Sequence, residues 1–165
     1  MNIAHSIQSI GFLTDFSESV LAYPIVLSTH LTCIALFGGM ILMTNLRLLG
    51  LTFKSVTITE MVTTLRPWKR WGGAVMFTTG LLLATSEAEK YAPNPYFWTK
   101  MSVLALIGVH ALIFRPIVYN RTEDLDRLSV IPTKVKVAAI LSLALWTTMF
   151  TMGRLIAYWD PNDHK

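Results

Sequence analysis

The chain has 165 residues, of which 53% are hydrophobic and only 15% are charged. Ordinary soluble domains carry about a quarter charged residues, so this composition argues against a soluble globular protein. Fourteen Lys and Arg against ten Asp and Glu give a formal net charge of +4. The length is that of one domain, because little chain remains for a soluble domain beside a bundle of membrane helices.

The first predicted element is a surface segment, residues 1–20. It contains Asp15 and Glu18 and lacks the basic start of a signal peptide, so we do not expect it to be cleaved. We expect a short amphipathic helix that lies on the outer surface of a membrane.

Four membrane helices are predicted next. Residues 23–46 contain no charged side chain, a run of 24 residues where about 20 cross a bilayer core. Three further charge-free runs are shorter, at residues 71–86, 101–114 and 137–153. Flanking aromatic and basic side chains extend each run to a spanning length. The predicted spans are residues 22–47, 67–87, 97–119 and 134–158.

The sequence therefore predicts an all-α protein, an integral membrane four-helix bundle over residues 21–160 with a tail at residues 161–165. A soluble helical bundle would need a polar stripe along each helix. Residues 31–43 and 137–146 contain no such stripe.

The distribution of Lys and Arg predicts the orientation of this bundle, because basic residues gather in cytoplasmic loops. Ten basic residues fall in the first and third connections: Arg47, Lys54, Arg66, Lys69, Arg70, Arg115, Arg121, Arg127, Lys134 and Lys136. Four fall on the other side: Lys90, Lys100, Arg154 and Lys165. Both termini are thus predicted on the outer, periplasmic side of a bacterial inner (cytoplasmic) membrane.

The connections contain local signals. Thr57 stands three residues before Glu60, the spacing of a capping box, so a cytoplasmic helix is expected to lead into the second span. Pro67 is expected to bend that helix. The stretch YAPNPYF, residues 91–97, is a predicted turn. The single Cys33 excludes an internal disulfide.

Two histidines fall inside predicted spans, His30 in LSTHLTCIALFGG and His110 in ALIGVHALIF. An ionisable group in hydrocarbon is costly, so each is a functional candidate. One interpretation is that each neutral ring only hydrogen-bonds a hydroxyl or carbonyl of a neighbouring helix. The other is metal ligation, because imidazole is a common axial ligand of haem iron in helical bundles.

We expect one b-type haem ligated by His30 and His110, with Gly38 leaving room for the flat macrocycle. From Tyr23, His30 is seven residues deep, and from Trp98, His110 is twelve. These depths are about 10 Å and 18 Å, a mismatch that helix tilt would have to absorb. A haem on one histidine with a different second ligand is the alternative, with Met76, Met101, Met149 and Met152 as possible thioethers.

Lys100 and Arg154 lie near the outer ends of their predicted helices. There they are expected to pair with haem propionates or to anchor the helices by reaching the lipid headgroups. The basic, aromatic stretch TTLRPWKRW is typical of a helix that touches anionic lipid. Cys33 and eight methionines allow copper binding, but the methionines form no cluster in the outward segments.

Two stretches, YPIVLSTHLTCIALFGGMILMTNLRLLGL and TTGLLLATSEAEKYAPNPYFWTKMSVLALIGVHALIF, resemble a family of small four-span bacterial membrane proteins of unknown function. That family is similar in turn to the copper-resistance D (CopD) proteins and to the HemJ protoporphyrinogen oxidases. The resemblance covers about residues 22–115. Its specific parts are the His30 helix ending in NLRLLGL, the pair Thr79–Gly80, and the pattern of Asn94, Phe97 and Lys100.

This resemblance implies a membrane four-helix bundle with His30 as the first haem ligand. HemJ proteins, which bind b-type haem, are similar in having an early-helix histidine and a later lysine, here His30 and Lys100. The family often carries Asn where this chain has His110, so the resemblance does not extend to His110 as a shared ligand.

We therefore expect a membrane-embedded b-type haem subunit that exchanges electrons between the quinone pool and a partner protein. Its expected partners are lipid, other subunits of a membrane complex and quinone, and no nucleic acid. Three alternatives stay open: a structural subunit without cofactor, a HemJ-like porphyrinogen oxidase, and a copper-handling protein. An electron-transfer or accessory subunit is expected rather than a stand-alone enzyme, because few residues lie outside the bundle.

Overall fold

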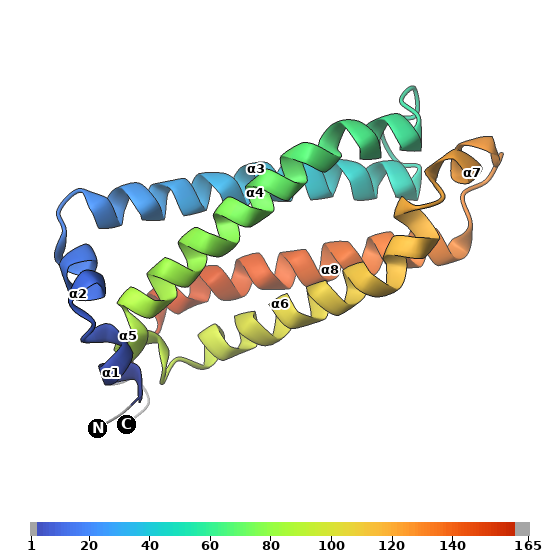
Figure 1. Cartoon of the computed structure of the whole chain (residues 1–165). Coiled ribbons are helices and arrows are strands. Elements are labelled where there is room, and N and C mark those ends of the chain that lie inside the picture. Colours follow the sequence, from blue (N-terminus) through green and yellow to red (C-terminus); the bar gives the residue numbers. More distant parts are fainter. Residues whose placement is uncertain (1–2, 161–165) are drawn as a thin grey trace.

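The structure is a computed structural model that describes residues 3–160, and its regular structure in that range is entirely helical. The predicted all-α class is therefore confirmed. Four long helices lie roughly along one axis in Figure 1: α3 (Ala22–Leu49), α4 (Ile58–Ser86), α6 (Pro95–Phe114) and α8 (Thr133–Leu155). The predicted tail, residues 161–165, lies outside the described range.

Short helices cover the two ends of these four. At one end lie α1 (Ile3–Gln8), α2 (Gly11–Glu18), α5 (Ala88–Tyr91) and the 3₁₀ turn η2 (Ile156–Tyr158). At the other end the π-helical turn η1 (Arg115–Tyr119) continues α6, and α7 (Thr122–Arg127) follows it. We call this second end, which also holds the α3–α4 loop, the basic end, because the ten basic residues of the first and third connections lie on that side.

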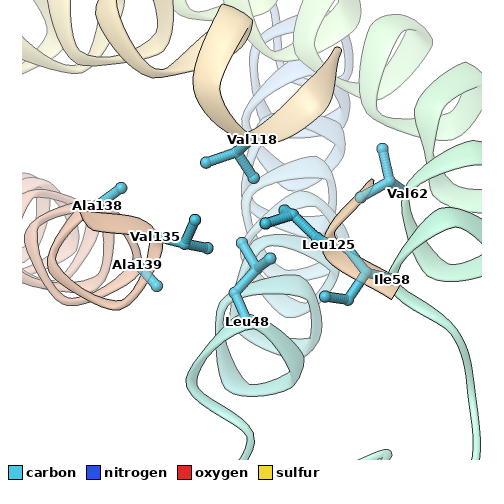
Figure 2. Packing of buried hydrophobic residues seen from close by; sticks show 8 residues of the cluster. All are labelled: Leu48, Ile58, Val62, Val118, Leu125, Val135, Ala138 and Ala139. Carbon is cyan, nitrogen blue, oxygen red and sulfur yellow. The ribbon is translucent and has the colours of Figure 1, made fainter. Parts of the chain in front are cut away.

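Neighbouring helices follow the order α4, α3, α8, α6. Helix α3 packs against both α4 and α8, and α6 packs against α8. At the basic end, one buried cluster joins α3, α4 and α8 with η1 and α7, as Figure 2 shows. Its members are Leu48, Ile58, Val62, Val118, Leu125, Val135, Ala138 and Ala139. A second cluster lies further along the bundle around Met76, Val103, Trp146 and Met149.

The long helices expose much of their apolar surface. Only 6% of the most apolar stretch of α3 is buried, and Leu36, Phe77 and Leu112 are each more than half exposed. Monomeric soluble proteins rarely expose apolar surface on this scale. In the described part of the chain, three helical stretches are long and apolar enough to cross a membrane: Ala22–Leu49, Pro95–Tyr119 and Thr133–Tyr158.

Helix α4 is not among these three stretches, although the sequence predicts a span within it. Its charge-free run covers residues 71–86 and is preceded at once by Lys69 and Arg70. The helix instead starts at Ile58, nine residues before the predicted span, and continues through Pro67. The expected cytoplasmic helix and the predicted second span are thus one continuous helix.

The start of α4 is fixed by two sets of hydrogen bonds. The Thr57 hydroxyl accepts the Glu60 amide at 3.1 Å, which confirms the predicted cap. The carboxylate of Asp126, from α7, accepts the amides of Ile58 at 2.6 Å and Thr59 at 2.9 Å. Helix α3 ends at Leu49 and is followed by Gly50, whose φ of +74° is the left-handed conformation that glycine adopts without strain.

The surface segment forms two helices where the sequence predicts one. Helix α1 docks on α5, where His5 Nδ1 contacts the Glu89 carboxylate and the Gln8 side chain accepts the Glu89 amide. Helix α2 buries Phe16 against the Tyr23 ring, with 5.8 Å between the ring centroids. The segment is thus held against the end of the bundle by both polar and aromatic contacts.

Candidate functional site

His30 is buried between α3 and α4 with 9% of its surface exposed. Its Nδ1 lies 2.9 Å from the Thr79 hydroxyl. That hydroxyl donates its one hydrogen back to its own helix, to the Val75 carbonyl at 2.7 Å. The Thr79 oxygen must therefore accept from His30, so the hydrogen-bond network assigns the proton to Nδ1. In the neutral ring, Nε2 then keeps a free lone pair.

Gly80 makes room for this ring. A Cβ at position 80 would lie 2.8 Å from His30 Cε1, closer than carbon atoms pack. The pair Thr79–Gly80, which carries part of the family resemblance, thus has a physical role. Thr79 orients the imidazole, and Gly80 lets it lie against the α4 backbone.

Lys100 reaches the same region from α6. Its charge is close enough to act on the His30 ring. Its Nζ lies 3.7 Å from where a Cβ of Gly153, on α8, would stand. Among residues 3–160, no carboxylate lies within 4 Å of Lys100 and no hydrogen bond from its Nζ is found.

We call this set of residues the outer polar site: His30, Thr79, Gly80, Lys100 and Gly153. It draws on all four long helices. It includes His30 and Lys100, two residues predicted from the sequence, together with a threonine and two glycines.

His110 lies elsewhere in the bundle. Its Nε2 is 3.0 Å from the Ala138 carbonyl of α8, and its ring lies 4.7 Å from that of Phe114. A carbonyl can only accept, so Nε2 carries the proton and only Nδ1 has a free lone pair. The two histidines therefore present opposite ring nitrogens.

Depth also separates the two histidines. His110 is ten residues beyond Lys100 on α6, about 15 Å at the helical rise. Two nitrogens on one metal lie only about 4 Å apart, twice a typical metal–nitrogen bond. In residues 3–160, His30 contacts Thr79 and His110 contacts Ala138 and Phe114, and no contact between the two histidines is found.

Gly38 and Arg154, the two other residues predicted to contact a cofactor, lie against groups outside the outer polar site. A Cβ at Gly38 would lie 2.6 Å from Phe150 Cζ, so Gly38 makes room for that ring between α3 and α8. Arg154 Nη2 donates to the Tyr158 hydroxyl at 2.6 Å, and its guanidinium lies over the Tyr158 ring. Both side chains of that pair are exposed at the end of α8.

Two of the four possible thioether ligands, Met76 and Met149, are buried in a hydrophobic cluster. They pack around Trp146, whose ring lies against those of Phe37 and Phe150. Cys33 is a free, half-buried thiol. Within residues 3–160, no group of three or more His, Cys, Asp or Glu is arranged to hold a metal ion.

In the pattern of Asn94, Phe97 and Lys100, the first two residues stabilise the start of α6. The buried Asn94 side chain accepts the amides of Tyr96 at 2.9 Å and Phe97 at 3.3 Å. Its amide group donates to the Ile156 carbonyl at 3.3 Å. Phe97 stacks on Tyr91 with 5.5 Å between the centroids. These contacts fix the helix that places Lys100.

A further polar group was not predicted from the sequence. Lys69 Nζ donates to the Thr44 hydroxyl at 2.6 Å, and Asn45 Nδ2 donates to the Ser142 hydroxyl at 3.0 Å. Thr44 and Asn45 are almost completely buried. Two adjacent polar residues in an apolar run indicate polar partners on facing helices, but they do not identify those partners.

These features define a class: an all-helical protein with three helices able to cross a membrane and polar side chains buried between its long helices. Within that class, the chain belongs to a family of unknown function, DUF6644, whose profile matches residues 7–159. The predicted membership of an unknown-function family is thereby confirmed, over more of the chain than the resemblance covers. No curated protein and no solved structure matches the chain significantly. Similarity to the copper-resistance D and HemJ proteins stays a hypothesis.

Proposed function

We propose that the chain is a four-span protein of the bacterial inner membrane that binds one b-type haem through His30 and transfers electrons. In this proposal α4 crosses the membrane in addition to the three more apolar helices. Its residues 71–86 lie in the hydrocarbon and its residues 58–70 lie at the basic end. That end faces the cytoplasm, and both termini face the periplasm. The excess of ten basic residues over four on the opposite side supports this orientation.

One observation carries the haem proposal, the contact between His30 Nδ1 and Thr79. Metal-ligating histidines usually donate their other ring N–H to a neighbouring acceptor, which fixes the tautomer and the ring orientation. Thr79 is such an acceptor, and it leaves Nε2 free to ligate. His110 has the opposite arrangement, so the proposal assigns it to helix packing.

Lys100 fits the same proposal as the cation that pairs with a haem propionate. A carboxylate is its best partner, because charge-assisted hydrogen bonds are the strong ones. The haem would carry one electron. The protein would supply the ligand of the iron and the cation that pairs with the propionate, and it would keep water away from the haem. Quinone and another membrane subunit are the proposed exchange partners.

A cofactor-free structural subunit is the second candidate. It is favoured by the finding that both histidines already have protein partners, Thr79 for His30 and the Ala138 carbonyl for His110. Two hollows of about 480 Å³ and 380 Å³ lie on other faces, one along residues 20–33 at the start of α3 and one between α3 and α8. Neither is lined by His30. In the described residues, no contact favours copper handling or porphyrinogen oxidation.

The reduced-minus-oxidised absorption spectrum of the purified protein tests this proposal. We expect the α band of b-type haem in the wild-type protein, its loss in His30→Ala, and its retention in the matched variant His110→Ala. Thr79→Val is expected to keep the haem but shift its midpoint potential, because the N–H of the ligand loses its acceptor. A colourless wild-type protein would support the structural subunit, and an unchanged His30→Ala spectrum would rule out His30 as ligand.

A further inference from the structure

Lys69 is held inward by an uncharged partner. Its ammonium donates to the Thr44 hydroxyl at 2.6 Å, and no carboxylate lies within 4 Å of it among residues 3–160. An ammonium group has three N–H donors, so two remain after the Thr44 contact. Its neighbours Arg66 and Arg70, by contrast, are exposed on the surface of α4.

The position of Thr44 places this ammonium near the edge of a bilayer. Helix α3 has 28 residues, about 42 Å of length against about 30 Å of hydrocarbon core. Thr44 is five residues from the end of α3 at Leu49, about 7 Å by the same rise. Trp68 and Trp71, which flank Lys69, are 68% and 74% exposed. Exposed tryptophans of this kind gather at the headgroup layer, so two independent features give the same depth.

Positive charge at the basic end is not balanced by the protein. The two ion pairs found in residues 3–160, His5–Glu89 and Lys90–Glu87, both lie at the opposite end. Asp126, one of only four acidic residues in the basic-end connections, binds the amides that start α4. This excess of positive charge favours the binding of a ligand with negative charge at this end of the bundle.

We propose that Lys69 is the centre of a binding site for the phosphate group of an anionic phospholipid in the leaflet at the basic end. Arg66, one turn earlier on α4, is the second donor. Its Nη2 donates to the Tyr119 carbonyl at 3.4 Å, which holds the guanidinium beside η1 with further N–H groups available. The exposed rings of Trp68 and Trp71 would pack on the acyl chains. This site does not depend on haem binding.

Native mass spectrometry of the purified protein with added lipid measures this site directly. We expect phosphatidylglycerol to bind more tightly than phosphatidylcholine with the same acyl chains. Lys69→Gln should weaken phosphatidylglycerol binding about tenfold, the effect of losing one hydrogen bond to a charged group. Lys134→Gln, which removes an exposed lysine at the same end, should change it less than about twofold.

Two further measurements distinguish a specific lipid site from misfolding of the variant and from binding of free phosphate. Lys69→Arg keeps the charge and is expected to bind phosphatidylglycerol within about threefold of the wild-type protein, which separates loss of charge from misfolding. Equal losses in Lys69→Gln and Lys134→Gln would show that lipid binds diffusely, and would overturn the site. Competition by millimolar inorganic phosphate would show that free phosphate is the ligand, which also overturns the lipid assignment.

Discussion

The two membrane histidines show how one residue type takes on two roles. From the sequence, His30 and His110 look alike, each a single imidazole in an apolar run. In the structure, His30 donates from Nδ1 to a side chain, whereas His110 donates from Nε2 to a backbone carbonyl. The identity of the facing residue therefore decides which ring nitrogen is free, and this depends on how helices pair.

Gly80→Ala tests the packing of the His30 ring. The added Cβ would lie 2.8 Å from His30 Cε1, so the imidazole or the helix must move. We expect a loss of about 1 to 3 kcal/mol in the free energy of unfolding, as for other overpacked interiors, measured by thermal melting in detergent. Gly108→Ala is the control, because nothing lies within 4 Å of its Cβ position. Equal melting temperatures for the two variants would contradict this packing.

At the scale of a helix, the start of α4 is fixed partly by local sequence and partly by a residue far away in the chain. The Thr57–Glu60 spacing predicts the start of the helix, and the structure confirms it. The carboxylate of Asp126 is a second cap, supplied from 68 residues away in the chain. No local pattern around residue 58 indicates that contact, because it arises only when α7 folds over the basic end.

Asp126→Ala removes this second cap. We expect a loss of about 1 kcal/mol in the free energy of unfolding at pH 7, the usual size of a cap. Asp124→Ala, an exposed change on the same short helix, is the control. An equal loss in both variants would show that α7, rather than the cap, is the sensitive element.

The Asp126 carboxylate is also expected to make the stability of the protein depend on pH. Burial by itself raises the pKa of the Asp126 carboxyl, but hydrogen bonds from Thr59 and Ile58 and the charge of Arg47 outweigh it and lower the pKa. Because the pKa is lower in the folded protein, the ionised carboxylate stabilises the fold at pH values above its ordinary pKa of about 4. This stability is lost as the pH falls through the folded-state pKa. The melting difference between wild-type and Asp126→Ala proteins should therefore shrink below about pH 4.

At the scale of the whole molecule, the number of membrane crossings depends on α4. The predicted four-helix bundle corresponds to the four long helices, but within residues 3–160 only three stretches are apolar and long enough to cross a membrane on those grounds alone. Lys69 and Arg70 reduce the apolar length of α4. Packing along α3 gives one of these two charges a polar partner, because the Lys69 ammonium donates to the Thr44 hydroxyl.

Cysteine accessibility distinguishes four crossings from three. In a Cys33→Ser background, single cysteines at Ser9, Ser129 and Asp160 are labelled in intact cells with a membrane-impermeant maleimide. Four crossings predict that Ser9→Cys and Asp160→Cys react from outside, and that Ser129→Cys reacts only after permeabilisation. Labelling of Ser9→Cys and Asp160→Cys on opposite sides would show that α4 does not cross.

The sequence by itself determined the helical class, the approximate positions of the four long helices, the turn before α6 and the cap at Thr57. These features follow from local properties, namely runs without charge, prolines and the spacing of polar side chains. It also indicated His30 and Lys100, because ionisable groups are rare in apolar helices.

Only the tertiary structure decided which of these groups meet. It turned the His30 ring toward Thr79, assigned Gly38 to the Phe150 ring, and turned Lys69 toward Thr44. The physical reason is that helix order and relative depth are set by packing between segments far apart in the chain. A shift of a few residues along one apolar helix, which leaves its composition almost unchanged, moves a side chain by several ångströms.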